Sequence, residues 1–344
     1  MGSKKVTFDD IARHTGFSKT TISRFFNNPG SLTRKNQEII RNALTELNYK
    51  ENKVAQILAT GETDFVGILV PNLMLHYYSE MLNQILLTYP EYGYKYIVFV
   101  GSEDPQVEQD YIQKLLSYQI AGLIVMSHST PSAQLAALSI PIVSIEREDI
   151  HICSVNSDNY TGALLATELL QKNGCDIFIH INTPTPITRP AYQRINGFRD
   201  YCTERGLRHE LFIRETGTSA SSITAAMLEL FNEIENRYPG QKKGIFFSDD
   251  TRANAFLNVL LRKYHVLPEE YRLVGFDNSP IAEQAVYPIS TVGQQIRLIA
   301  HETVALLHEK ILEYRSGADW SAPPVHRVIT PMLYPRATTD DGGQ

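Results

Sequence analysis

Residues 6–24 read VTFDDIARHTGFSKTTISR, and this stretch decides the fold of the N-terminal part of the chain. Thr7 and Ser18 each stand where a helix can start, because their side-chain oxygens can accept a hydrogen bond from the first turn. Gly16 marks a turn between the two helices. The residues of their shared apolar face are Ile11, Ala12, Phe17 and Ile22. The stretch therefore predicts two short helices joined by a turn.

The outward side of the second predicted helix carries small polar and cationic side chains. These are Lys19, Thr20, Thr21, Ser23, Arg24 and Asn27. A helix that lies in the major groove of DNA needs such groups to reach base edges and phosphates. The alternative is an ordinary helical hairpin with a solvated face, because helix-turn-helix patterns are short. The sequence favours the DNA-binding interpretation.

Charge is distributed unevenly along the 344 residues. Residues 1–60 contain ten Lys and Arg against five Asp and Glu, so this part has a charge of +5. The remainder has a charge of −11, which gives the whole chain its net charge of −6. A small basic part on a large acidic body suits a protein that binds a polyanion with one end only. Apolar residues make up 43% of the chain and charged residues 20%, which is ordinary for a soluble globular protein.

Cysteines and apolar runs indicate the compartment. Cys153, Cys175 and Cys202 are odd in number and widely spaced, which fits a reducing environment and small core residues. The sequence has no apolar run of the roughly 18 residues that span a bilayer and no signal peptide before residue 6. We expect a cytoplasmic protein that does not interact with membranes.

Two further helical segments are expected before residue 62. Ile39, Ile40, Ala43, Leu44 and Leu47 have helical spacing, which predicts a third helix over 33–47. Residues 52–61 can form about two helical turns, with a capping Asn at the start and a Gly at the end. A helix this short is marginal alone in water, so we expect it to order against a partner.

From residue 65 short β-branched runs alternate with helical segments. The expected strands are 66–70, 96–100, 122–126, 142–145, 177–181, 244–247 and 273–275. The expected helices are 80–89, 107–118, 161–171, 191–204, 221–235, 253–263 and 296–314. Alternation of this kind predicts parallel sheets covered by helices, in two doubly wound lobes of roughly 130 residues each. Helix 296–314 is expected to return to the first lobe, and ligands in such folds bind at the carboxyl ends of the strands.

With its head, linker helix and two α/β lobes in this order, the chain resembles the LacI/GalR family of bacterial transcription regulators over nearly its whole length. The residues that carry the resemblance in the head and linker are Val6-Thr7, Asp10-Ile11-Ala12, Gly16-Phe17-Ser18, Thr21-Ile22-Ser23-Arg24, Leu47-Asn48-Tyr49, Asn52 and Val54-Ala55. Those in the lobes are Val66-Gly67-Ile68, Gly122-Leu123-Ile124, Pro141-Ile142-Val143, Ser157-Asp158-Asn159, Arg194, Gly197-Phe198, Ser248-Asp249-Asp250, Gly275-Phe276-Asp277 and Ser290-Thr291-Val292. Within that family, Ser248-Asp249-Asp250, Asn173-Gly174-Cys175 and Ser157-Asp158-Asn159 look most similar to repressors of sucrose operons.

The resemblance implies a helix-turn-helix head over 1–50 and a hinge helix over 51–62. It also implies lobes of the periplasmic-binding-protein type, the N-terminal lobe from 63–160 with 293–322 and the C-terminal lobe from 161–292 with 323–340. Two departures from the family pattern stand out. Glu51 replaces a common Pro, which puts a carboxylate near DNA, and Cys175 replaces a common His.

For the head, the resemblance assigns base reading mainly to Lys19, Thr20 and Arg24. Phosphate or register contacts fall to Thr7, Ser18, Thr21, Ser23 and Asn27. For Thr21 and Ser23 the alternative is simple helix capping or exposure to solvent. In the linker, the resemblance implies that Leu58 of each protomer enters the minor groove and separates a central base step. The residues that would line that groove are Asn52, Lys53, Ala55 and Gln56.

Sugar binding needs hydrogen-bond donors and acceptors around a polar ring, often with an aromatic face beside it. The candidates lie at or just after expected strand ends, and they are His76, Tyr77, Tyr78, Glu146, Arg194, Asp249, Asp277 and Gln294. Asp158 and Asp250 are alternatives that could equally cap helices. Extra cations in the cleft, such as Arg189 or Arg252, would favour a phosphorylated sugar.

We expect a homodimeric repressor that binds a pseudo-palindromic operator in double-stranded DNA and is released by a sugar. The alternative within this class is a corepressor or a phosphorylated sugar. Two other classes stay open, a solute-binding receptor and a sugar-modifying enzyme. The absent export signal and the basic head argue against the receptor. No nucleotide-binding glycine loop, no Gly-x-Ser-x-Gly and no His-Glu-x-x-His occurs, so we expect no catalytic residues, no metal and no cofactor.

Overall fold

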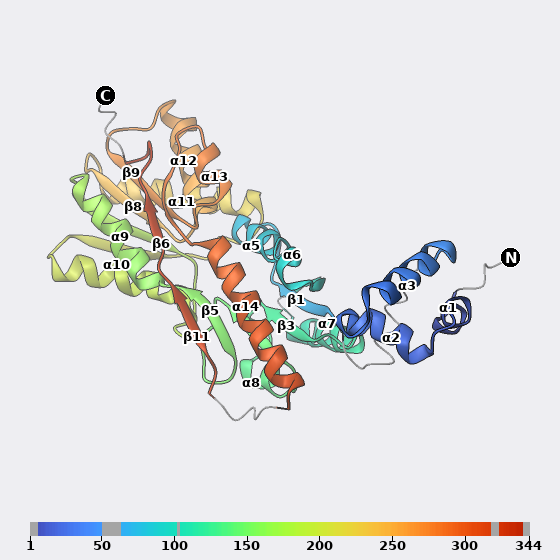
Figure 1. Ribbon diagram of the computed structural model, residues 1–344. Coiled ribbons are helices and arrows are strands. Elements are labelled where there is room, and N and C mark those ends of the chain that lie inside the picture. Colours follow the sequence, from blue (N-terminus) through green and yellow to red (C-terminus); the bar gives the residue numbers. More distant parts are fainter. Residues whose placement is uncertain (1–5, 50–62, 102–103, 318–322, 340–344) are drawn as a thin grey trace. The chain divides into compact units, whose positions relative to one another are not determined.

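The computed structural model describes residues 6–49, 63–101, 104–317 and 323–339 (Figure 1). By its internal contacts the chain divides into two compact units, residues 1–62 and 63–344.

The smaller unit is helical. Its elements are α1 (Phe8–Thr15), α2 (Lys19–Asn27), the short 3-10 helix η1 (Pro29–Ser31) and α3 (Arg34–Glu46). Thr7, Ser18 and Thr33 cap the three α-helices, because each side-chain oxygen accepts a backbone N–H of the first turn. Gly16 ends α1 with φ of 73°, a left-handed conformation that suits glycine. The predicted helix-turn-helix and third helix are therefore confirmed.

A small apolar core holds these helices together. Ile11, Ile22 and Ile40, one from each α-helix, are fully buried. The Phe8 ring stacks on the Phe26 ring with 5.1 Å between centroids. The partly buried residues around this core are Val6, Phe8, Ala12, Phe17, Phe25, Phe26, Leu32, Leu44, Leu47 and Tyr49. The outward side of α2 is consequently left to its polar residues.

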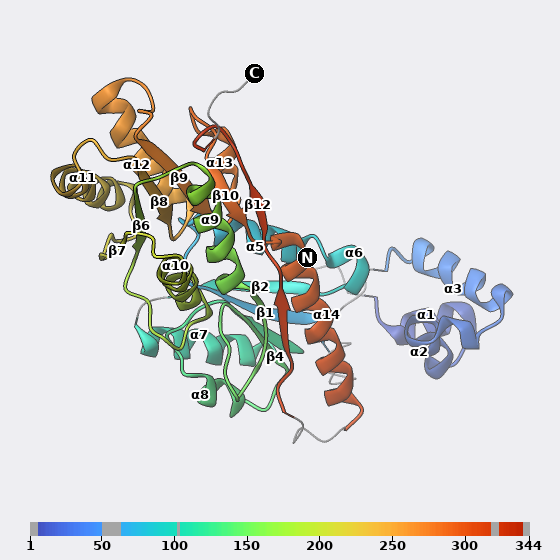
Figure 2. The same ribbon diagram turned by 90° about the vertical axis from the view of Figure 1, so that its left-hand side faces the viewer.

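The first sheet of the larger unit has the strand order β11-β5-β4-β3-β1-β2, and every pairing is parallel (Figure 2). Its strands are β1 (Phe65–Val70), β2 (Lys95–Val100), β3 (Gly122–Val125), β4 (Ile142–Ile145), β5 (Cys153–Ser157) and β11 (His326–Ile329). Alternate residues of β1 point to opposite faces, so Val66 and Ile68 enter one apolar cluster while Leu69 enters another. A sheet that is apolar on both faces needs helices on both sides.

The helices associated with this first lobe are α5 (His76–Leu86), α6 (Tyr89–Tyr92), α7 (Pro105–Ser117), α8 (Ser132–Ala136) and α14 (Ile296–Arg315). Buried residues of α5 and α14 pack on one face of the sheet, and buried residues of α7 pack on the other. The expected return of the helix over 296–314 to the first lobe is thereby confirmed.

The second sheet has the order β12-β10-β9-β8-β6-β7, parallel except for the β10–β12 pair. Its strands are β6 (Ile177–Asn182), β7 (His209–Ile213), β8 (Lys243–Phe247), β9 (Tyr271–Phe276), β10 (Ser290–Gly293) and β12 (Met332–Tyr334). The associated helices are α9 (Asn159–Lys172), η2 (Pro190–Tyr192), α10 (Gln193–Glu204), α11 (Ala220–Arg237), α12 (Asp250–Tyr264) and α13 (Pro280–Gln284). Residues of α11 and α12 join the core cluster on one face, and residues of α9 and α10 join the cluster on the other.

The chain passes between the lobes three times, after β5, after β10 and after β11. The last passage corrects one predicted boundary. Residues 323–340 were expected in the second lobe, but β11 pairs with β5 of the first sheet, and only β12 joins the second sheet. The chain therefore adds one strand to each sheet after α14.

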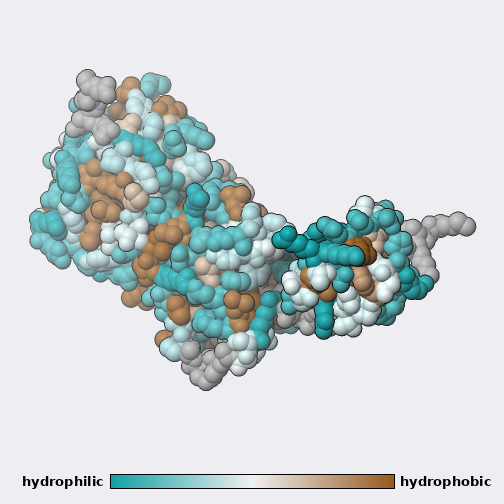
Figure 3. Space-filling model, in the orientation of Figure 1, coloured by the Kyte–Doolittle hydropathy of each residue, from teal (hydrophilic) through white to brown (hydrophobic). Residues whose placement is uncertain are grey.

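The face of the molecule shown in Figure 3 is largely hydrophilic, and separate apolar patches interrupt it on the larger unit. Among the described residues, no helix combines the length and the apolar character needed to cross a membrane.

Candidate nucleic-acid interface and ligand cleft

The exposed side of α2 presents Lys19, Thr20 and Arg24. Ile22 is fully buried on the opposite side, so the helix cannot rotate without losing its core contact. The Lys19 ammonium lies 2.6 Å from a carboxylate oxygen of Asp9, and both side chains are more than half exposed. An exposed pair of this kind contributes little to stability, so Lys19 can exchange Asp9 for a phosphate or a base at low cost.

Thr7 and Ser18 also have structural roles. Thr7 forms a reciprocal capping box with Asp10, in which the Thr7 N–H donates to the Asp10 carboxylate at 2.9 Å. The Ser18 oxygen accepts the Thr21 N–H at 3.1 Å and lies 2.9 Å from the Thr21 hydroxyl. The caps place these polar groups beside the exposed face of α2. Asn27 is the last residue of α2, and Ser23 is half-buried.

The expected linker contacts Asn52, Lys53, Ala55, Gln56 and Leu58 lie outside the described residues, as does Glu51.

The expected ligand residues follow the carboxyl ends of the parallel strands in both lobes. Glu146 comes directly after β4, Asp277 after β9, and Gln294 after β10. Asp249 precedes α12 as its N-cap and follows β8 by two residues. His76, Tyr77 and Tyr78 form the first turn of α5, four residues before the expected helix start, and α5 has no side-chain cap to mark this point. Because parallel strands end at one edge of a sheet, this edge is where a ligand is expected.

Arg194 is buried and is held in place by several neighbouring groups. It is the second residue of α10 and is 7% exposed. Its Nε donates to the Asn159 side-chain oxygen at 2.7 Å, and Nη1 donates to the Ser248 carbonyl at 2.5 Å. The guanidinium also lies 3.7 Å above the centroid of the Phe276 ring. These contacts fix the plane of the guanidinium inside the protein.

Two tyrosines and a carboxyl group belong to the same electrostatic environment. The Tyr77 and Tyr78 rings meet edge to face with 5.3 Å between centroids. The pKa of Tyr78 is raised to about 12, mainly by burial and also by the Glu146 charge, while the Arg189 and Arg194 charges oppose the shift. Burial raises the pKa of Glu146, opposed by the Arg194 charge and a hydrogen bond from Asn159. Among the described residues, the Tyr77 hydroxyl and one Glu146 oxygen are buried without a hydrogen-bond partner.

A hydrogen-bonded chain joins the two lobes behind these groups. The Ser157 hydroxyl at the end of β5 donates to the Gln294 side-chain oxygen at 2.7 Å. The Gln294 amide nitrogen donates to a carboxylate oxygen of Asp277, also at 2.7 Å. Burial raises the pKa of Asp277 well above its usual range, and the Arg194 charge opposes this. Asp277 has φ of 107°, so its backbone is held in a conformation unusual for a residue with a side chain.

The two consecutive aspartates have different roles. Asp249 caps α12, accepts the Arg252 N–H at 2.9 Å and forms an ion pair with the Arg252 guanidinium. Asp250 is 1% exposed and accepts the Ser279 N–H at 2.7 Å and the Thr291 hydroxyl at 2.6 Å. Asp250 is therefore neither a cap nor exposed to a ligand. Asp158 does cap its helix, α9, by accepting the Thr161 N–H at 2.9 Å.

The structure thus brings several expected ligand residues into one connected group, which consists of Tyr77, Tyr78, Glu146, Arg194, Asp277 and Gln294. Asp249 lies beside it, because Ser248, whose carbonyl binds Arg194, also donates its hydroxyl to Asp249 at 3.1 Å. His76 is half-buried at the start of α5 and has no described contact with this group.

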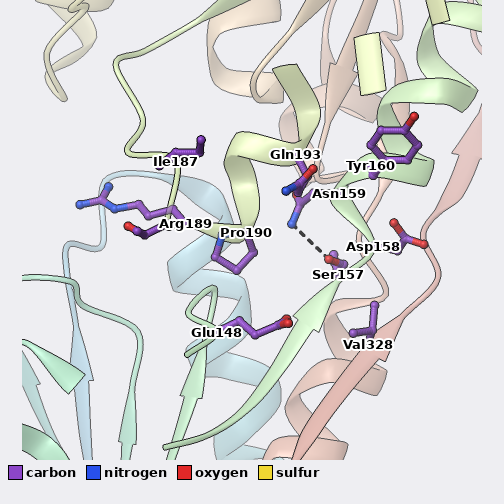
Figure 4. Close-up of a pocket in the computed structure, with 11 residues that line it drawn as sticks. Glu148, Ser157, Asp158, Asn159, Tyr160, Ile187, Arg189, Pro190, Gln193 and Val328 are labelled. Atoms are coloured by element: carbon purple, nitrogen blue, oxygen red, sulfur yellow. Dashed lines mark hydrogen bonds between the residues drawn. The ribbon is translucent and has the colours of Figure 1, made fainter. Parts of the chain in front are cut away.

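A pocket of about 290 Å³ lies between the lobes next to this group (Figure 4). Figure 4 shows Ser157, Asn159 and Gln193 on one side, Glu148 below, and Arg189 extending away from them. The residues that line it are Glu148, Ser157, Asp158, Asn159, Tyr160, Ile187, Thr188, Arg189, Pro190, Gln193 and Val328.

Sequence reasoning missed Asn159 and Ser157 as parts of the site. Both lie where β5 passes into α9, and β5 was not expected as a strand because Ser154, Asn156 and Ser157 make it polar. The signal available was that a short polar run led directly into a capped helix.

Among the described residues, no group of three or more His, Cys, Asp or Glu is arranged to hold a metal ion.

Two family models match the chain. "Bacterial regulatory proteins, lacI family" matches residues 7–52, and "Periplasmic binding protein-like domain" matches residues 167–339. The sucrose operon repressor of Pediococcus pentosaceus is 30% identical over 311 residues, which cover 89% of this chain and 93% of that protein. The sucrose operon repressor of Streptococcus mutans is 29% identical over 315 residues, covering 91% and 95% respectively.

Among solved structures, the lac repressor dimer bound to operator and the anti-inducer ONPF has a TM-score of 0.80. It is 22% identical, and the match covers 98% of this chain and 99% of that chain. This likeness confirms the expected fold, a helical head followed by two α/β lobes.

Proposed function

The chain belongs to the LacI family of bacterial regulatory proteins, and from this premise we propose that it is a sugar-responsive repressor of carbohydrate-utilisation genes. One observation carries the proposal. The same chain has a capped helix whose exposed side holds Lys19, Thr20 and Arg24, and a two-lobed unit in which Arg194 is fixed beside an interlobe pocket. The protein would act in the cytoplasm, where its DNA target lies.

In this proposal α2 lies in the major groove. Lys19, Thr20 and Arg24 read bases, and Lys19 sets the main sequence preference. The residues proposed to contact phosphates are Thr7, Ser18, Thr21, Ser23 and Asn27. The linker residues Asn52, Lys53, Ala55 and Gln56 would line the minor groove around Leu58.

The DNA-bound form is proposed to be a symmetric dimer on a pseudo-palindromic operator. The structurally similar lac repressor is described as a dimer bound to operator. In this chain, large apolar side chains of the first lobe are exposed, with Met74 at 68%, Leu87 at 62% and Tyr89 at 52%. We propose that the second protomer covers these exposed apolar side chains.

The ligand is proposed to be a sugar held by Tyr77, Tyr78, Glu146, Arg194, Asp277 and Gln294, with Asp249 and His76 at the margin. The names of the sucrose operon repressors support this class of effector. A sugar that contacts both lobes binds one lobe angle better than another, and this difference in affinity is what releases the DNA.

The decisive experiment measures binding of the full chain to its own promoter fragment by fluorescence anisotropy across a salt series. We expect salt-sensitive binding that Lys19→Ala weakens at least tenfold, while Arg262→Ala, an exposed cation in the last turn of α12, leaves binding unchanged. A sugar screen by thermal shift on wild type and Arg194→Ala identifies the effector. Absence of salt-sensitive binding to any promoter duplex refutes the DNA function.

The linker is tested separately with Leu58→Ala. We expect this variant to fold normally but to lose most specific operator affinity. The Leu58 side chain would no longer separate the central base step, and the contacts with the kinked duplex that offset the unstacking free energy would be lost. Thermal denaturation checks the fold, and anisotropy with operator and non-operator duplexes checks specificity. Operator affinity equal to wild type would exclude the insertion of Leu58 between base pairs.

A further inference from the structure

Arg189 is a cation that lines the ligand cleft and forms no ion pair with any described residue. It belongs to the second lobe just before η2, is half-buried and lines the interlobe pocket with Ser157 and Asn159 (Figure 4). Within residues 6–49, 63–101, 104–317 and 323–339, its guanidinium has neither a hydrogen bond nor an ion pair. Arg252, the other candidate cation, differs because Asp249 and Thr216 occupy its guanidinium.

The first lobe places a second cation within electrostatic reach of Arg189. Arg147, directly after Glu146, is 8% exposed. Its guanidinium donates to the Thr130 carbonyl at 2.8 Å, to the Ser132 hydroxyl at 2.9 Å and to the Ser127 carbonyl at 2.7 Å. All three acceptors are neutral, and no carboxylate in the described part of the chain forms an ion pair with it.

Unused polar atoms surround Arg147. In the described part of the chain, its Nε and the hydroxyls of Ser127 and Thr130 are buried without a partner. Glu108 is a fully buried carboxylate that contacts Thr130. One of its oxygens accepts the Thr130 N–H at 2.9 Å, and the other has no partner. The charges of Glu108 and Asp149 reach Arg147 but do not contact it. Buried polar atoms without partners mark a place that is completed by water or a ligand.

In the described part of the chain, no neighbouring carboxylate forms an ion pair with these two arginines, although the Glu108 and Asp149 charges act on Arg147. The charge of Arg189 acts on Tyr78, His128 and Arg147 across the cleft. The pKa of His128 is lowered to about 3, mainly by burial and also by the Arg189 and Arg147 charges, so this imidazole is neutral. Burial likewise favours the protonated forms of the Glu146 and Asp277 carboxyl groups. Cations held in a desolvated site without a counter-ion favour an anionic ligand.

We propose that the effector is an anionic carbohydrate, whose anionic group is held between Arg189 of the second lobe and Arg147 with His128 of the first. The ring lies against Glu146, Arg194 and Asp277. This inference rests on the proposed function and specifies the ligand of the same cleft. The anionic group is a phosphate ester or a carboxylate, since both accept hydrogen bonds from guanidinium groups. Because the two arginines belong to different lobes, the anion stabilises one lobe arrangement.

The test uses calorimetric titration of the full chain without DNA. The probes are glucose, fructose and sucrose, their 6-phosphates, glucuronate and inorganic phosphate. The variants are Arg189→Ala, Arg189→Lys and the matched control Arg262→Ala. We expect a sugar phosphate or glucuronate to bind at least tenfold more tightly than the neutral parent sugar. Arg189→Ala should remove this preference and its salt dependence, Arg189→Lys should restore part of it, and Arg262→Ala should change nothing.

The outcomes separate the two proposals. The anionic subsite is overturned if a neutral sugar binds as tightly as its phosphate and Arg189→Ala has no effect on binding. The proposal of a sugar-responsive regulator then still stands. Inorganic phosphate that binds as tightly as the sugar phosphates shows an anion site only and also overturns the inference. Failure of every sugar to bind overturns both the subsite and the sugar response. Promoter binding, measured independently, decides the DNA function.

Discussion

Asp250 shows how a residue next to a ligand cleft can serve the fold alone. Both carboxylate oxygens are occupied by donors from Ser279 and Thr291, which tie α12 to the segments after β9 and in β10. Gly275 makes room for it, because a Cβ there would lie 2.2 Å from an Asp250 oxygen. From sequence, Asp249 is expected to contact the ligand and Asp250 to be either a ligand contact or a cap, whereas in the structure Asp249 is the cap. The assignment of Asp250 depends on Ser279 and Thr291, which are 29 and 41 residues away along the chain.

The buried Asp250 predicts a pH dependence of stability. Burial raises its pKa from 3.8 to about 7, so between these values the folded state binds a proton that the unfolded state has lost. The free energy of unfolding therefore falls as pH rises from about 4 to 7, and this contribution is constant above 7. Asp250→Asn mimics the protonated group and should gain about 1–3 kcal/mol relative to wild type between pH 5 and pH 8.

Urea denaturation of wild type and Asp250→Asn at both pH values measures this difference. Asp110→Asn, an exposed carboxyl on α7, is the control and should show no differential gain. The Asp250 charge also raises the pKa of Asp277, so Asp250→Asn removes that contribution too, and the measured difference includes both carboxyl groups. Equal pH dependence in wild type and Asp250→Asn would contradict the raised pKa.

At the scale of elements, apolar periodicity predicted the central strands and the long helices. β1, β3, β4, β6 and β8 are runs of buried apolar residues, and they appear within about one residue of the expected positions. The edge strands β7 and β11 and the short β12 escaped prediction. In β11 the alternation of exposed and half-buried residues starts with His326 and Arg327, so nothing in its composition marks a strand. Its place is decided by pairing with β5, which is a long-range contact.

The head could be predicted closely because its information is local. Thr7, Ser18 and Thr33 each stand directly before a helix, and their hydrogen bonds span only three residues. Thr7→Ala removes the side-chain oxygen that accepts the Asp10 N–H and the hydroxyl that donates to the Asp10 carboxylate, while the backbone N–H of residue 7 remains. We expect it to destabilise the start of α1 by about 1 kcal/mol. Hydrogen exchange of the peptide covering 8–15 in the full chain should accelerate, whereas Thr45→Ala, inside α3, should not change that peptide. Unchanged exchange in Thr7→Ala would show that the core alone holds α1.

At the scale of the whole molecule, the sequence predicted which residues follow strand ends but not how the lobes connect. The Ser157–Gln294–Asp277 chain joins two of the three crossings, and its members come from positions 137 and 17 residues apart. Such a link follows from the topology of both sheets together. Ser157 belongs to the first sheet, and Asp277 follows a strand of the second. These hydrogen bonds therefore connect the proposed effector-binding residues with the relative position of the lobes.

Ser157→Ala tests whether the hydrogen bonds from Ser157 through Gln294 to Asp277 transmit the effector signal. The variant keeps the Gln294–Asp277 hydrogen bond but removes the donor from the first lobe. We expect the effector to bind within threefold of wild type, because the Glu146, Arg194 and Asp277 contacts remain. The ratio of operator affinities without and with effector should fall at least fivefold, since that ratio measures the coupling free energy between the two sites. Anisotropy with operator gives the ratio, and calorimetry gives effector affinity. Ser316→Ala, an exposed serine after α14, should keep the full ratio. An undiminished ratio in Ser157→Ala would mean that the lobes are coupled through other contacts, whereas loss of effector binding would make Ser157 a ligand contact instead of a link.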